Sequence, residues 1–309
     1  MWFLRPKIYM IDWSQKNVVR SIISPVAYHV EEFSSLKRSY HYHGARGITS
    51  NKEHIFIAAQ NVIFVFDKDL KLIREIHNNL FNGLHELDWY SGSLYVTCAV
   101  TDSILALNQE GDVTKSFLLG NNPFFTSKFN LEPRTLDNRL DYRVMHRCRR
   151  LYHINNVQVT NDGVYAGFNI QGAFVKIHPF EEILIADTKL NMCHNAQYTP
   201  DREHILINDT KHYSLQVFDH NCKHLRTIDL RKLDLPIDFS QKTTFGTGHQ
   251  IKAGWLRGME FSRVDQNIVF LGLSPSSILA IDYVKGKMVD FMKLRRNIWI
   301  TVHGIHNLS

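Results

Sequence analysis

Three histidines stand at equivalent places in a pattern that repeats along this sequence. His85, His194 and His303 each begin a short run of strand-forming residues, and equal lengths of chain separate them. In a ring of repeats, equivalent residues lie around one axis. Three imidazoles that converge on an axis can each give one nitrogen to a single ion, as a catalytic Zn or Fe centre requires. The sequence therefore predicts a divalent transition metal, Zn or Fe, bound by these histidines.

A second interpretation of these histidines stays open. One histidine at the start of a strand more often hydrogen-bonds a nearby backbone group or a water molecule than a metal. On that interpretation the three histidines are incidental to function.

Three more polar residues occupy the same place in the other repeats, namely Arg46, Asn155 and Arg257. Arginine offers a fixed fork of donors to a carboxylate or a phosphate and keeps its charge. The three residues therefore predict a binding site for a small anionic substrate. The alternative is that the arginines form ion pairs with Glu86 and Glu260 of the repeats themselves.

Two neighbours of these positions are candidates for catalysis. Glu86 follows His85, where it is placed to orient the imidazole or to act as a general base. Strand alternation instead predicts that Glu86 points to the opposite face and joins adjacent repeats. His153 precedes Asn155 by two residues and should face the same side, as a fourth ligand or a proton shuttle.

The elements that position these residues are short strands. Each repeat of about 40 residues holds three or four of them, separated by tight turns, which is typical of a propeller blade. Complete copies cover residues 46–76, 84–108, 155–185, 194–230 and 257–292. A sixth copy is split, with strands two to four at the N-terminus and a first strand at residues 302–309.

The repeats predict an all-β fold, a six-bladed β-propeller that forms a single domain over residues 1–309. The C-terminal strand would be innermost in the last blade and the N-terminal strands would complete it, which leaves no free sheet edge. Two insertions, residues 119–152 and 231–256, exceed what a blade needs. We expect both of them to cover the site.

Composition narrows the class of protein. The net charge is only +6, and the basic residues are scattered apart from Arg147 to Arg150 and Lys293 to Arg296, which disfavours nucleic acid as a partner. Four widely spaced cysteines indicate free thiols in a reducing compartment. No apolar run is long enough to span a membrane, and no signal peptide is recognisable. The sequence predicts a soluble cytoplasmic protein and leaves its oligomeric state open.

Several phrases of the sequence carry a family resemblance. They are LHELDW with LYVTC, HRCRRLYHINNVQV, CHNAQY, GWLRGMEF with IVFLGLS, and the ending VHGI. Their order resembles a little-characterised family of bacterial six-bladed propeller proteins, over most of the chain. The architecture is more distantly similar to the gluconolactonase, strictosidine synthase and NHL-type propellers, several of which hold a metal or an active site at one channel mouth. Histidines stand where gluconolactonases have carboxylates and Asn.

Two functions follow from these observations. The first is a metal-dependent enzyme that acts on a small anionic substrate, by hydrolysis or elimination with Zn and by oxygen chemistry with Fe. The second is a non-catalytic propeller that binds a ligand or a protein.

Overall fold

The computed structural model describes residues 7–25, 45–137, 139–144, 150–187, 189–190, 192–244, 250–295 and 301–308. The chain divides into two compact units, Met1–Leu151 and Tyr152–Ser309, called unit 1 and unit 2. The single domain expected over the whole chain stays a prediction.

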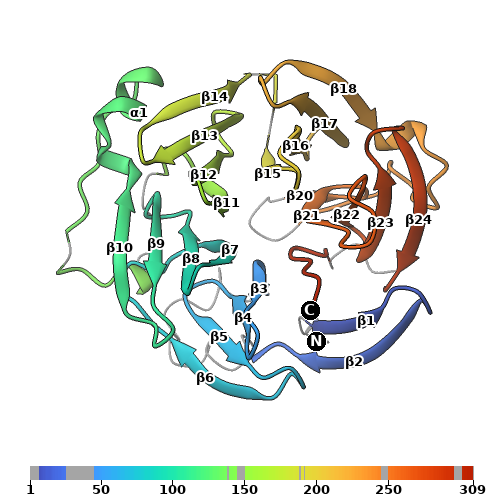
Figure 1. Ribbon diagram of the computed structural model, residues 1–309, viewed down its shortest axis with the longest axis horizontal. Coiled ribbons are helices and arrows are strands. Elements are labelled where there is room, and N and C mark those ends of the chain that lie inside the picture. Colours follow the sequence, from blue (N-terminus) through green and yellow to red (C-terminus); the bar gives the residue numbers. More distant parts are fainter. Residues whose placement is uncertain are drawn as a thin grey trace. The chain divides into compact units, whose positions relative to one another are not determined.

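Unit 1 holds two four-stranded antiparallel sheets and one two-stranded sheet in its described residues (Figure 1). The first sheet consists of β3 (Ile48–Ser50), β4 (Ile55–Ala58), β5 (Ile63–Phe66) and β6 (Leu72–Ile76). The second consists of β7 (Leu84–Tyr90), β8 (Ser93–Cys98), β9 (Ser103–Leu107) and β10 (Val113–Leu118). The two-stranded sheet pairs β1 (Lys7–Asp12) with β2 (Asn17–Ile23).

Unit 2 holds three four-stranded sheets of the same kind in its described residues (Figure 1). They consist of β11 (Ile154–Thr160), β12 (Gly163–Phe168), β13 (Ala173–His178) and β14 (Glu182–Ala186); of β15 (Cys193–Tyr198), β16 (His204–Asp209), β17 (Ser214–Asp219) and β18 (His224–Asp229); and of β21 (Leu256–Phe261), β22 (Ile268–Leu273), β23 (Ser277–Asp282) and β24 (Lys287–Lys293). A short hairpin pairs β19 (Lys242–Thr244) with β20 (Gln250–Lys252).

Strand position within each sheet explains the hydrophobic pattern. The third strands are apolar runs whose residues are buried on both faces, as in β5, β9 and β23. The fourth strands are edge strands and keep most residues exposed, as in β10 and β18. Each four-stranded meander is therefore one propeller blade.

The expectation of six blades is wrong, because the described chain contains five four-stranded blades. Residues 301–308 form no strand and lie against the fifth blade instead. Val302 N–H donates to the Leu273 carbonyl at 3.3 Å, and the Asn307 side chain donates to the Phe261 carbonyl. These polar groups of the segment therefore form hydrogen bonds with the ends of β21 and β22. The sheet of β1 and β2 remains two-stranded.

The first strands are interrupted where the sequence placed its site residues. The pairing register with the second strand shifts after Leu84, Ile154, Cys193 and Leu256, and each of these is followed directly by His85, Asn155, His194 or Arg257. A β-bulge of this kind leaves a residue out of the ladder and re-aims its side chain.

The backbone before these bulges is left-handed in three blades. Two residues before the site residue, φ is +66° at Gly83, +52° at His153 and +56° at Met192. Non-glycine residues adopt this conformation at a cost, so His153 and Met192 are held by their surroundings.

The first insertion begins at the His85 end of its own blade. Cys98 pairs with Leu84 and Leu118 pairs with Ser103, so β10 ends where β7 begins. The described part of the insertion holds η4 (Leu119–Asn121), α1 (Pro123–Lys128) and η5 (Tyr142–Val144).

The described part of the first insertion is anchored rather than loose. Arg134 Nη1 donates to the Val100 carbonyl at 2.9 Å, and Tyr142 N–H donates to the Asn79 carbonyl at 2.8 Å. Residues 147–149 of the basic run lie outside the described residues. No helix in the described ranges has the length and apolar character that would let it cross a membrane.

The second insertion begins at the His194 end of its own blade. Asp229 pairs with Ser214 and Asp209 pairs with both Ser214 and Cys193, so β18 ends where β15 begins. The insertion opens with η6 (Leu230–Lys232) and contains β19 and β20. The roof that both insertions were expected to form over one site stays a prediction.

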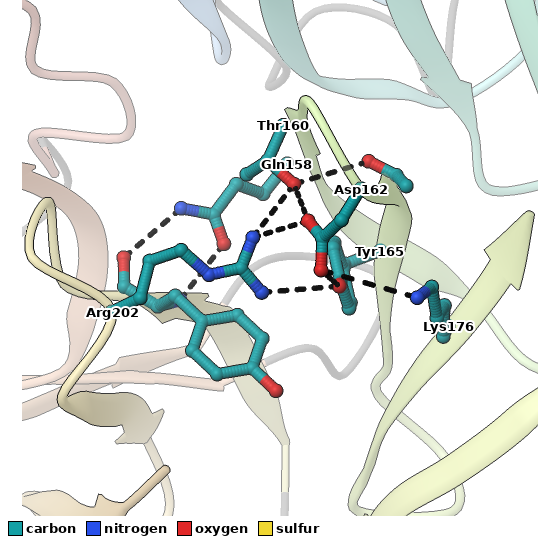
Figure 2. A network of polar contacts seen from close by, with 8 residues as sticks. Gln158, Thr160, Asp162, Tyr165, Lys176 and Arg202 are labelled. Atoms are coloured by element: carbon teal, nitrogen blue, oxygen red, sulfur yellow. Dashed lines mark hydrogen bonds and ion pairs between the residues drawn. The ribbon is translucent and has the colours of Figure 1, made fainter.

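A polar network joins two blades of unit 2 at their other end (Figure 2). Asp162, in the turn between β11 and β12, accepts hydrogen bonds from Arg202 and Thr160, and one from the Tyr165 hydroxyl at 2.8 Å. Lys176 Nζ lies 4.0 Å from the same carboxylate. Arg202 belongs to the turn between β15 and β16, so the network ties neighbouring blades together.

Replacing Asp162 with asparagine is expected to lower the free energy of unfolding by about 1 kcal/mol at pH 7, since the pair is partly exposed. Burial alone would raise the pKa of Asp162, but hydrogen bonds from Arg202, Thr160 and Tyr165 lower it well below its usual range. The stabilisation is therefore present above the unfolded pKa of about 3.9 and is lost as the pH falls below it. Urea unfolding at pH 7 and pH 3 checks this, with exposed Asp234→Asn as the control. An equal difference at both pH values would contradict the assignment.

Candidate functional site

His194 is the most constrained imidazole in unit 2. It is 6% exposed, and its Nδ1 lies 2.8 Å from both the Met192 carbonyl and the Thr210 hydroxyl oxygen. A carbonyl oxygen only accepts hydrogen bonds, so Nδ1 carries the proton and Nε2 is left as an acceptor. Arg257 Nη1 donates a hydrogen bond to this Nε2. The imidazole is thus held neutral between a carbonyl and a guanidinium.

The surroundings keep His194 uncharged. Burial lowers its pKa well below 6.5, and the positive charge of Arg257 and the nearby rings of His303 and His153 lower it further. The hydrogen bond to Met192 acts in the opposite direction but is weaker. A neutral imidazole with an Nε2 lone pair is the form that accepts protons.

Arg257 is a cation in an unfavourable environment. Burial lowers its pKa to about 10, and its guanidinium carbon lies 5.3 Å from the centre of the Trp255 ring. Its Nε is a buried donor that has no hydrogen-bond partner in the described part of the chain. Glu260, one of the carboxylates proposed from sequence as its partner, lies 3.4 Å from His306 Nδ1 instead. Among the described residues, Arg257 makes no ion pair with a carboxylate.

Asn155 lies on the other side of His194, on the neighbouring blade. It is 3% exposed, and its Nδ2 donates to the Cys193 carbonyl at 3.4 Å. Its Oδ1 is buried and has no hydrogen-bond partner among the residues that the structure describes. The first strands that carry Asn155, His194 and Arg257 lie side by side, since β15 contacts both β11 and β21. Three successive blades therefore place these residues in one row.

A second arginine–histidine pair lies in unit 1. Arg46 Nη1 is 3.0 Å from Nδ1 and 3.4 Å from Nε2 of His85, and it donates to the Leu84 carbonyl at 3.1 Å. His85 Nδ1 lies 2.7 Å from the Gly83 carbonyl, so this imidazole is fixed in the same tautomer as His194.

Both arginines are followed by a glycine that permits close approach. A Cβ on Gly47 would lie 2.3 Å from the His85 carbonyl oxygen, and one on Gly258 would lie 2.9 Å from the His303 carbonyl oxygen. Within unit 2, residues 301–308 therefore lie beside β21. Within unit 1, β7 lies beside β3 in the same way. The His303 backbone lies beside Gly258, and residues 301–308 form no strand.

Glu86 sits inside a bulge, where the alternation argument does not apply. Its backbone N–H donates to the Thr97 hydroxyl at 2.8 Å, and its Oε1 lies 3.4 Å from its neighbour's N–H on Leu87. Its role as a general base stays a prediction.

The described residues contain no group of three or more His, Cys, Asp or Glu side chains that would hold a metal ion. The Nε2 lone pair of His194 is engaged by Arg257, and a guanidinium beside that atom repels a cation. His85 belongs to unit 1, whereas His194 and His303 belong to unit 2. The site in unit 2 fits an anion better than Zn or Fe.

Sequence reasoning missed a polar residue just after the second strand. Thr210 donates to the Leu256 carbonyl at 2.8 Å, and Asn169 donates to the Cys193 carbonyl at 2.8 Å. Each fixes the residue that precedes a site residue on the next blade. Aligning the ends of the second strands as well as the starts of the first would have found them.

Comparison with known proteins identifies the fold. No protein-family model matches the chain, and no curated protein matches it either. A crystal structure of a protein of unknown function from Bacteroides caccae has a TM-score of 0.60 at 10% identity, covering 96% of this chain and 93% of that chain. A catalytically inactive histidine-to-alanine variant of virginiamycin B lyase from Staphylococcus aureus, solved with quinupristin, has a TM-score of 0.51 at 13% identity, covering 83% and 72%. The predicted all-β propeller is therefore confirmed as the fold of this chain.

Proposed function

We propose that the chain is an enzyme that acts on a small anionic substrate at the row formed by Asn155, His194 and Arg257. One observation carries the proposal. Arg257 is a partly buried cation whose guanidinium donates a hydrogen bond to a neutral imidazole, and it makes no ion pair with a carboxylate in the described residues. Burying such a charge is costly, and an anionic ligand would offset that cost.

Binding of the anion would also release the base. A carboxylate or phosphate is a stronger acceptor for a guanidinium than a neutral imidazole is. When Arg257 turns its donors to the substrate, His194 Nε2 becomes free to take a proton. The Nδ1–H bond to Met192 keeps the ring in place and stabilises the imidazolium that forms. Proton abstraction of this kind fits elimination, and hydrolysis by an activated water is the second option.

A structural neighbour supports a role for a histidine. The Staphylococcus aureus propeller is named a lyase, and replacing one of its histidines with alanine makes it catalytically inactive. His153 and His303, close enough to influence His194, would move the proton to solvent.

The three-histidine metal centre stays a second proposal, with Zn or Fe bound by His85, His194 and His303. This proposal requires His194 Nε2 to lose its hydrogen bond with Arg257 and to bind the metal instead. Metal analysis of protein purified without added metal tests it, with the triple His→Ala variant as the comparison. If the unmodified protein contains stoichiometric metal and the variant does not, the metal centre would be favoured over the metal-free proposal.

His194→Gln tests the proposed base. The variant is expected to retain anion binding and to lose turnover by about 10² to 10⁴-fold, because glutamine does not accept a proton. A screen of carboxylates and phosphate esters by thermal shift supplies binding partners, and product formation is followed by NMR. Turnover that is unchanged in His194→Gln would overturn the assignment. Binding by the unmodified protein without turnover of any compound would favour the non-catalytic propeller.

A further inference from the structure

Two buried polar atoms on the blades either side of the His194 blade need opposite partners. Asn155 Oδ1 is an acceptor and Arg257 Nε is a donor, and neither has a hydrogen-bond partner among the described residues. Native proteins satisfy nearly all such atoms, and each exception costs about 1–3 kcal/mol. A ligand that carries both a hydrogen-bond acceptor and a hydrogen-bond donor would satisfy both atoms.

The orientation of the Asn155 amide follows from its neighbours. The Cys193 carbonyl only accepts hydrogen bonds, so the NH₂ group of Asn155 faces it. Asn169 donates to the same carbonyl at 2.8 Å. Oδ1 is therefore the atom that Asn155 leaves available, and it can pair only with an N–H or O–H.

We infer that the substrate is an anion that also carries a hydroxyl or N–H group close to its charge, and that Asn155 recognises this second group. The inference rests on the proposed function and names its substrate class. Arg257 holds the anionic oxygens and Asn155 accepts from the donor, with His194 between them. Arg257 is only partly buried, so part of its side chain is accessible to solvent.

The class excludes simple monocarboxylates as good ligands. An anion without a donor satisfies Arg257 and leaves Asn155 Oδ1 buried and unpaired. A site built for a hydroxyl discriminates strongly against the analogue that lacks it, for this reason.

Three probes separate the two parts of the site. Lactate carries both groups, propionate lacks the hydroxyl, and methyl lactate lacks the charge. Isothermal titration or ligand-observed NMR with the full chain is expected to show lactate binding about tenfold more tightly than propionate, with no binding of methyl lactate. In Asn155→Leu, a change of similar volume, the ratio of the two dissociation constants is expected to fall to about one.

The outcomes are distinct. Equal binding of lactate and propionate by the unmodified protein overturns the inference and leaves the anion site standing. Binding of neither anion overturns both the inference and the proposed function. A preference for lactate that survives in a folded Asn155→Leu variant assigns the recognition elsewhere and overturns the role of Asn155. The comparison in the unmodified protein stands by itself if that variant does not fold.

Discussion

Arg257→Met is expected to weaken lactate binding strongly and, at the same time, to stabilise the fold. Hydrogen bonds to charged groups contribute about 1.5–3 kcal/mol, so affinity should fall by roughly 10- to 150-fold. Methionine fills much of the same space without a buried charge. Replacing buried charges with apolar side chains is often neutral or stabilising, and we expect a gain of about 1 kcal/mol in the free energy of unfolding. Opposite signs for binding and stability are typical of a functional residue.

The same variant has a spectroscopic signature. The charge of Arg257 lowers the pKa of His194, so its removal should raise the pKa of that imidazole toward its ordinary value. An NMR titration of the histidine resonances measures this change. Arg263→Met, at an exposed position, is the control and should alter neither binding nor the His194 titration. Loss of stability in Arg257→Met without any change in His194 would show that Arg257 is structural.

Asp102→Asn is expected to lower the free energy of unfolding by about 3 kcal/mol. The Asp102 carboxylate is fully buried, accepts from Leu151 N–H at 2.7 Å and lies 3.2 Å from Arg134 Nη2. Removing one partner of a buried pair leaves the other charge uncompensated, which typically costs about 3–5 kcal/mol. Asn tolerates the left-handed backbone at this position, where φ is +46°, so the substitution tests the carboxylate rather than the backbone.

In Asp102→Asn, we expect the first insertion to unfold before the blades do. Asp102 and Arg134 hold the described part of residues 119–151 against the β8–β9 turn, so limited proteolysis of Asp102→Asn is expected to cleave within the insertion first. Asp69→Asn is the matched control, because Asp69 pairs with Arg20 at 3.3 Å on the surface, where its side chain is 80% exposed. That change should stay within about 0.5 kcal/mol. Equal effects of the two substitutions would contradict the anchoring role of Asp102.

Periodicity was enough to locate the strands and the row of polar residues. Each repeat of about 40 residues has a buried, apolar third strand. This pattern can be recognised in the sequence even where the loops differ in length. The starts of the first strands could therefore be aligned, and His85, Asn155, His194 and Arg257 occupy matching positions in the structure.

Side-chain partners were beyond the reach of the same reasoning. Whether His194 faces a metal or Arg257 depends on a left-handed residue at Met192 and on the Thr210 hydroxyl of another strand. Aligning the strands locates both positions, but it does not show which atoms lie beside the His194 ring. The prediction of a sixth blade was wrong for a related reason. Residues 301–308 resemble a first strand in composition, but their hydrogen bonds go to the ends of β21 and β22.

The bulges at the head of each first strand have a consequence for how this protein can change. A residue that stands outside the ladder can be exchanged without disturbing the pairing of its neighbours, so histidine, asparagine and arginine occur at one position in different blades of the same chain. Under the proposed function, the residues that bind the substrate and the residues that pair the strands stand at separate positions. A few substitutions at the bulges would then change the ligand that is bound while every blade kept its fold.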